Sequence, residues 1–192
     1  MPLSSAVMGA PKTISVKGDV VKMDGKVITL TKKTEQGPRV NISLKAAKAV
    51  LGPPEREHRP NESKCFYIWD AFGMQIAEWQ DSIFSVVVRF SPPHFIAQEG
   101  ESESARDARL YVHNLNKALA VKSDYEGTVS INGVQVSKGT RLSKIEPALR
   151  KIGFKFDRVR HEAELERDYY EVFLRWQEDD ETMVDFSFRV AK

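Results

Sequence analysis

The sequence has one cysteine, no glycine-rich segment and no long apolar run, and each of these shortages excludes a class of protein. With Cys65 alone, no disulfide can form within the chain. Cys65 lies in the apolar run CFYIW, which predicts a buried, unreactive thiol. The N-terminal residues MPLSSAVMGAPKTISV are not typical of a signal peptide, and no later run could span a membrane. We therefore expect a cytoplasmic protein without a membrane partner.

The sequence also lacks an excess of either charge. It holds 29 basic and 27 acidic residues, which give a net charge of +2 at pH 7. Residues 101–192 contribute 16 basic and 17 acidic residues, so that half carries about −1 and the preceding half, with 13 and 10, about +3. Nucleic-acid-binding domains normally carry a clear basic excess. We therefore expect no nucleic-acid partner.

Residue patterns typical of catalysis are missing as well. The four histidines are scattered, with no H-x-x-x-H spacing and no cysteine pair, which argues against a metal site. There is no glycine-rich phosphate loop and no G-x-S-x-G element. We predict a protein that is not an enzyme, with no catalytic residue, no cofactor and no metal.

Two turn signals are present. The segments MDGK and SINGV place Asp24-Gly25 and Asn132-Gly133 between alternating apolar residues, and this pattern is typical of two-residue hairpins. The apolar residues before the turns, Val21 with Met23 and Val129 with Ile131, correspond at an offset of 108.

The similarity continues beyond the turns. A helical apolar stripe, Ile145, Ala148, Leu149 and Ile152, precedes Gly153, and Leu44, Ala47 and Leu51 precede Gly52 at an offset of 101. Val88-Arg89-Phe90 then matches Phe188-Arg189-Val190 at an offset of 100. Falling offsets over elements in the same order indicate a duplicated unit with trimmed loops.

These elements predict an α+β protein made of two tandem ββαββ units, with antiparallel sheets and helices packed on one face. The first unit spans residues 1–95 and the second spans 123–192. Residues 96–122 form a linker that contains an amphipathic helix, because apolar residues recur there at spacings of three and four. Function is then expected where the units differ, in the loops 31–41, 53–64, 91–104 and 155–168 and in the acidic segment after Trp176.

A few residues are candidates for contact with a partner. Trp79 and Trp176 end strands beside charged residues, where an aromatic ring serves equally well as an interface anchor or a core lid. Glu178, Asp179, Asp180 and Glu181 form an acidic hairpin tip, which is a solvated turn or a prong for a basic cleft. Asp70 follows a strand and is either a turn residue or a general acid or base.

The carriers of a family resemblance are Gly25, Leu51-Gly52, Pro54, Tyr67, Trp69, Asp70 and Gly73. A hairpin with a turn glycine, a helix ending in Leu-Gly-x-Pro and a strand reading Tyr-x-Trp-Asp-x-x-Gly resemble an uncharacterised bacterial family of small predicted immunity proteins. Such proteins lie beside polymorphic toxins or type VI secretion effectors. The resemblance covers the first 90 residues best, since the second unit lacks the Trp-Asp-x-x-Gly part.

The resemblance implies a non-enzymatic immunity protein, or antitoxin. It would bind a cognate toxin or effector that acts in the cytoplasm, encoded by the adjacent gene, and would block the active site of that toxin. Two alternatives remain open. One is an adaptor or assembly protein of a bacterial secretion system, and the other is a hydrolase with an unrecognised site around Asp70 and His58.

Overall fold

A computed structural model describes residues 9–34, 37–79, 82–91, 119, 121–177 and 180–190, without the side chains of 32–38 and 82–84. The described chain is mostly β, with two α-helices, α1 (Leu44–Leu51) and α3 (Leu142–Lys151). The predicted α+β class with two tandem ββαββ units is wrong, because large, mainly antiparallel sheets take strands from both halves of the chain. The predicted linker helix falls almost wholly outside the described residues.

The larger sheet has eight strands in the order β12-β13-β14-β15-β9-β8-β7-β6, and every neighbouring pair is antiparallel. Its first-half strands are β6 (Arg56–Asn61), β7 (Lys64–Trp69), β8 (Met74–Trp79) and β9 (Ser82–Arg89). Its second-half strands are β12 (Lys155–Asp157), β13 (Glu162–Arg167), β14 (Tyr170–Trp176) and β15 (Met183–Val190). The pairing of β9 with β15 therefore joins the two halves into one sheet.

The smaller sheet has five strands in the order β11-β10-β1-β2-β3. Its strands are β1 (Thr13–Lys17), β2 (Val20–Met23), β3 (Lys26–Val27), β10 (Thr128–Ile131) and β11 (Val134–Ser137). The central strand β1 pairs antiparallel with β2 and parallel with β10, so this sheet also contains both halves. The turns predicted at Asp24-Gly25 and Asn132-Gly133 are confirmed, with positive φ angles of 45° and 79° in the first and 47° and 91° in the second.

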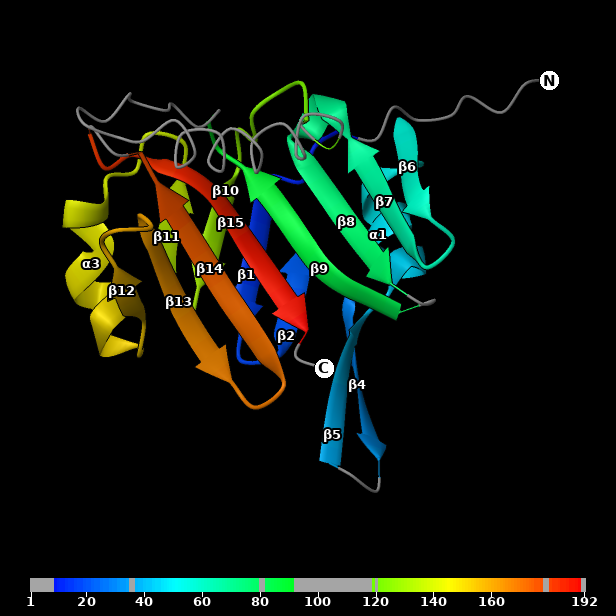
Figure 1. Cartoon of the computed structure of the whole chain (residues 1–192), viewed down its shortest axis with the longest axis horizontal. Coiled ribbons are helices and arrows are strands. Elements are labelled where there is room, and N and C mark those ends of the chain that lie inside the picture. Colours follow the sequence, from blue (N-terminus) through cyan, green and yellow to red (C-terminus); the bar gives the residue numbers. More distant parts are fainter. Residues whose placement is uncertain are drawn as a thin grey trace.

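The two sheets pack face to face, with the helices beside the small sheet (Figure 1). Alternate residues of each strand point into the core, as the burial of Ile14 and Val16 in β1 and of Val129 and Ile131 in β10 illustrates. Helix α1 begins after Ser43, whose hydroxyl accepts a hydrogen bond from Ala46 N at 3.1 Å. Both helices contribute side chains to the shared hydrophobic core, among them Leu51 of α1 and Leu149 of α3.

The strand pairing between the halves has an approximate two-fold symmetry. Val87 of β9 pairs with Ser187 of β15, two positions that are 100 residues apart, and the pairs on either side are symmetric about them. In the small sheet, β2 and β10 run in opposite directions on the two sides of β1. Strand edges that each half would leave unpaired are therefore closed by the other half.

One element breaks this symmetry. The segment predicted as a loop at 31–41 lies in a two-stranded arm, β4 (Thr29–Thr34) and β5 (Gly37–Ile42), which projects from the body in Figure 1. Its base is anchored by Val40 and Ile42, which are 1% and 4% exposed. The predicted loops at 53–64 and 155–168 likewise contain the whole of β6, β12 and β13. Short charged strands at sheet edges have little apolar periodicity, so they resemble loops in sequence.

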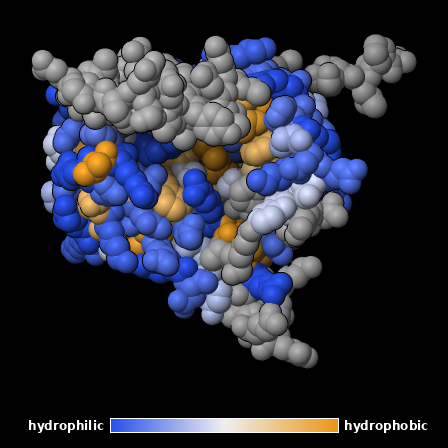
Figure 2. All heavy atoms as spheres, viewed as in Figure 1, coloured by the Kyte–Doolittle hydropathy of each residue, from blue (hydrophilic) through white to orange (hydrophobic). Residues whose placement is uncertain are grey.

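The outer face of the large sheet carries both polar and apolar side chains. One row across the strands contains Ile68, Gln75, Val87, Ser187 and Phe173. Figure 2 shows this side of the molecule as mostly hydrophilic, with hydrophobic residues gathered toward its middle. No helix in the described part of the chain is long and apolar enough to cross a membrane.

Candidate partner-binding surface

Asp70 lies in a 3-10 turn after β7, and its carboxylate is 4% exposed. Arg56 of β6 donates to both of its oxygens, from Nε to Oδ2 at 2.7 Å and from Nη2 to Oδ1 at 3.0 Å. The backbone N–H of Lys122 also donates to Oδ1, at 3.1 Å. These hydrogen bonds from Arg56 lower the pKa of Asp70 below its ordinary value, so the carboxylate is ionised and saturated with donors from its own chain.

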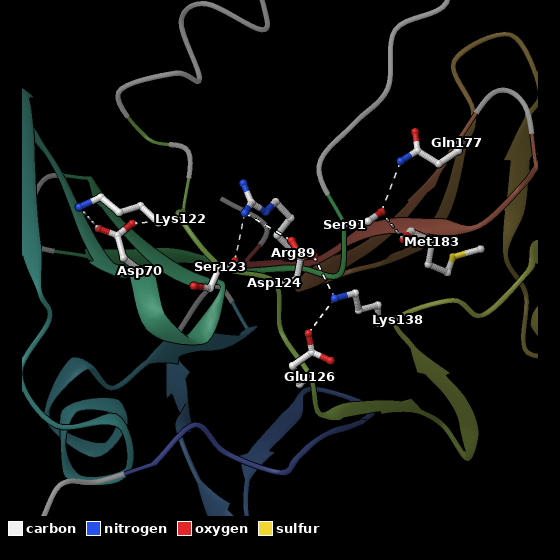
Figure 3. Close-up of polar contacts among 10 residues, drawn as sticks. All are labelled: Asp70, Arg89, Ser91, Lys122, Ser123, Asp124, Glu126, Lys138, Gln177 and Met183. Carbon is white, nitrogen blue, oxygen red and sulfur yellow. Dashed lines mark hydrogen bonds and ion pairs between the residues drawn. The ribbon is translucent and has the colours of Figure 1, made fainter.

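The contacts of Asp70 belong to a polar network that holds residues 121–126 against the sheet (Figure 3). Arg89 of β9 donates from Nη2 to Ser123 O at 3.1 Å and lies 3.4 Å from Asp124 Oδ1. Lys138 then bridges Asp124 and Glu126 at 3.2 and 2.7 Å. The network ties the start of the second half to strands of the first, which makes Asp70 an anchor of the fold.

The other predicted contact residues lie in different places. Trp79 ends β8, at the opposite end of that strand from Asp70, and is half-buried with the Lys64 ammonium 5.6 Å from its ring centroid. Trp176 is only 4% exposed and packs against Phe156 and His161 at centroid distances of 6.2 Å each. Trp176 is thus placed as a core lid, the second of its two expected roles.

The acidic tip is described only from Asp180 onward, since Glu178 and Asp179 lie outside the described residues. Asp180 Oδ1 accepts hydrogen bonds from Thr182 N at 3.0 Å and from Thr182 Oγ1 at 2.7 Å. Glu181 has a φ angle of 57°, its carbonyl accepts from Leu142 N at 2.9 Å and its carboxylate pairs with Arg158 at 3.1 Å. Glu181 therefore contacts both the first turn of α3 and Arg158, while Asp180 closes the turn to Thr182.

Trp176 and Glu181 both contact Arg158, which belongs to a surface that we call the α3 surface. It consists of exposed residues at the N-cap of α3, on α3, on β12 and on the turn after β12: Arg141, Lys144, Lys151, Lys155, Arg158, Val159 and Arg160. Glu146 of α3 joins its parts, because the carboxylate pairs with both Arg150 and Arg158. Those two partners lower the pKa of Glu146 against the opposing effect of burial.

The turn that carries Val159 is held on both sides. Asp157 Oδ1 accepts hydrogen bonds from the backbone N–H groups of Val159 and Arg160, each at 3.0 Å. The Arg158 guanidinium lies 6.0 Å from the Phe156 ring centroid and 5.8 Å from that of Trp176. At the top of this turn the Val159 side chain is 90% exposed. The fold therefore presents an aliphatic side chain to solvent from a fixed backbone.

The sequence contains a cluster of basic residues at this surface, but counting charges over each half of the chain did not reveal it. Residues 138–160 hold eight basic and two acidic residues, a local charge of +6. Residues 161–185 hold two basic and ten acidic residues, a local charge of −8. The two blocks cancel within the second half, so only a shorter counting window would have shown the basic cluster.

Other features of the described residues are weaker candidates for a functional site. No group of three or more potential metal ligands lies together among them. An open depression of about 150 Å³ is lined by Lys155, Phe156, Asp157, Arg160, Glu162 and Glu164, beside the α3 surface. Burial raises the pKa of Glu162, against the lowering effect of Arg175 and Arg189. His58 lies against Phe66 at a centroid distance of 6.4 Å, while the carboxylate of Asp70 is taken by Arg56.

The described features define a two-layer, mostly β protein whose two halves share both main sheets. A family model described as "Domain of unknown function (DUF7738)" matches residues 13–146, more than half of the chain, and the chain belongs to this family. The match runs from β1 into α3 and so includes strands of both halves. No curated protein and no solved structure matches the chain.

Proposed function

We propose that this protein is an immunity protein that binds a cognate bacterial toxin in the cytoplasm and neutralises it by protein–protein contact, without chemistry of its own. The proposal continues the resemblance of the segments around Gly25, Gly52 and Trp69. The observation that carries it is the exposed Val159 on its hydrogen-bonded turn, between Arg158 and Arg160 in the sequence.

The physical argument concerns the cost of association. A protein interface loses affinity when loops and side chains must be ordered on binding, so a contact surface that is already fixed binds more tightly for the same area. The backbone N–H of Val159 donates a hydrogen bond to Asp157 Oδ1, and Arg158 forms ion pairs with Glu146 and Glu181. Arginine is enriched at the centres of protein interfaces, and Val159 lies between Arg158 and Arg160 in the sequence, where it offers a small apolar contact.

Co-expression tests the proposal directly. The product of the adjacent gene is expressed in bacteria from an inducible promoter, with and without this protein. We expect growth arrest from the gene product alone, recovery of growth with this protein, and co-elution of the two purified proteins from a size-exclusion column at a one-to-one ratio.

A toxic gene product that is not neutralised, or a mixture that elutes as two separate proteins, would contradict the proposal. The comparison also separates it from an adaptor role. An adaptor would form a complex with secretion components and leave toxicity unchanged, whereas an immunity protein must abolish toxicity in the same cells.

A further inference from the structure

Several cations of the α3 surface are without partners in the described chain. Among the described residues, no carboxylate lies within 4.0 Å of the basic groups of Arg141, Lys144 or Lys151, although all three side chains are exposed. Lys144 and Lys151 are seven residues apart on α3 and therefore lie on one face of the helix. No ion pair within the described chain therefore neutralises these two exposed charges.

The two-fold related part of the molecule provides an internal comparison. There α1, β6 and the turn after β6 take the place of α3, β12 and the turn of Val159. That turn is polar, Asn61-Glu62-Ser63, and is closed by a hydrogen bond from Ser63 N to Asn61 Oδ1 at 3.0 Å. Residues 44–62 hold four basic and three acidic residues, a local charge of +1, whereas residues 138–160 carry a local charge of +6. The same scaffold therefore forms without a basic cluster or an exposed valine.

We infer that the α3 surface is the face that docks the partner, and that the partner's docking face is acidic with a small apolar pocket for Val159. This inference rests on the proposed function and names the chemistry of the toxin at the contact. Opposite charges steer the two proteins together and set their orientation. Val159 then fills an apolar recess at the centre, with Arg158 and Arg160 on either side of it.

Charge reversal on α3 tests the electrostatic part. The variant Lys144→Glu/Lys151→Glu is compared with Lys22→Glu/Lys45→Glu, which makes the same change in net charge at exposed positions on β2 and α1. Binding to the product of the adjacent gene is measured by surface plasmon resonance at low and physiological salt. We expect the α3 variant to bind at least about tenfold more weakly, mainly through slower association, and the control to stay within about twofold.

The substitution Val159→Asp tests the apolar contact. We expect it to weaken binding about tenfold or more, mainly through faster dissociation, while Val27→Asp, at a side chain that is 48% exposed elsewhere, leaves binding within about twofold. Circular dichroism and thermal melting check that all four variants are folded like the wild type.

The outcomes separate the inference from the function on which it rests. A wild-type protein that forms no complex with the gene product overturns the proposed function and this inference with it. A complex that tolerates both the charge reversal on α3 and Val159→Asp overturns this inference alone. Tight, salt-dependent binding of the wild type to a labelled DNA duplex or single-stranded RNA, lost in Lys144→Glu/Lys151→Glu, also overturns it, because the surface would then serve a nucleic acid.

Discussion

Replacing Asp70 with alanine is expected to lower the free energy of unfolding by about 3 kcal/mol. The substitution removes a buried carboxylate that accepts from Arg56 and from the backbone of Lys122, and it leaves the guanidinium of Arg56 without this partner. Arg56 keeps about a third of its side chain exposed, at 31%, so the expected loss lies at the low end for a buried ion pair. Urea unfolding followed by tryptophan fluorescence measures the change.

The same substitution should alter the dependence of stability on pH. Because the folded pKa of Asp70 lies below its ordinary value of 3.8, its contribution is complete above about pH 4 and disappears as the pH falls through the lower folded value. The difference in unfolding free energy between wild type and Asp70→Ala should therefore shrink in strong acid. As a control, Glu57→Ala removes exposed pairs to Lys48 and Arg59 and should cost no more than about 0.5 kcal/mol. Equal losses from the two substitutions would show that Asp70 is not an anchor.

Replacing Gly73 with alanine is expected to cost roughly 3 to 5 kcal/mol or to prevent folding. Gly73 has a φ angle of 63°, and a Cβ atom there would lie 2.5 Å from Tyr125 N, 2.7 Å from Asp124 C and 2.8 Å from Ser123 O. All three are backbone atoms of the segment that the network around Asp70 holds in place. The segment would have to move away, which breaks the hydrogen bond from Tyr125 N to Arg89 O at 2.6 Å.

Gly18 offers a matched control for that experiment. Its φ angle is 61°, close to that of Gly73, but a Cβ atom there would meet nothing within 4 Å. Gly18→Ala should therefore show only the conformational cost of a left-handed residue, about 1 kcal/mol. Thermal melting of both variants separates the two contributions. Similar melting temperatures would mean that the approach of residues 123–125 to Gly73 is not tight in solution.

Local elements were predictable from the sequence, but their partners were not. The Asp-Gly and Asn-Gly turns and the apolar stripes before Gly52 and Gly153 correctly placed two hairpins and two helices, because their signals depend on neighbouring residues. The fold class was wrong because it depends on which strand edges meet. Nothing in the alternation of β9 shows that its free edge pairs with β15 rather than with solvent.

The candidate surface was missed for a related reason. Trp176 and Glu181 were identified as contact residues from their position beside charge, whereas the structure places the indole in the core and pairs the carboxylate with Arg158. Val159 stands out only once its turn is known, since a single valine between two arginines has no apolar periodicity. Exposure is a property of the assembled fold and cannot be deduced from one residue and its neighbours.

The sharing of both sheets between the halves has a consequence for synthesis on the ribosome. When residues of the first half have left the ribosome, β9 has β8 as a partner but must wait for β15, and β1 must wait for β10. About 100 further residues have to be translated, which takes roughly 5 to 20 s at typical rates of synthesis. During that time two strand edges remain open to other chains. Folding is thus completed late and through contacts distant in sequence, so we expect a slow folder whose yield depends on the speed of translation.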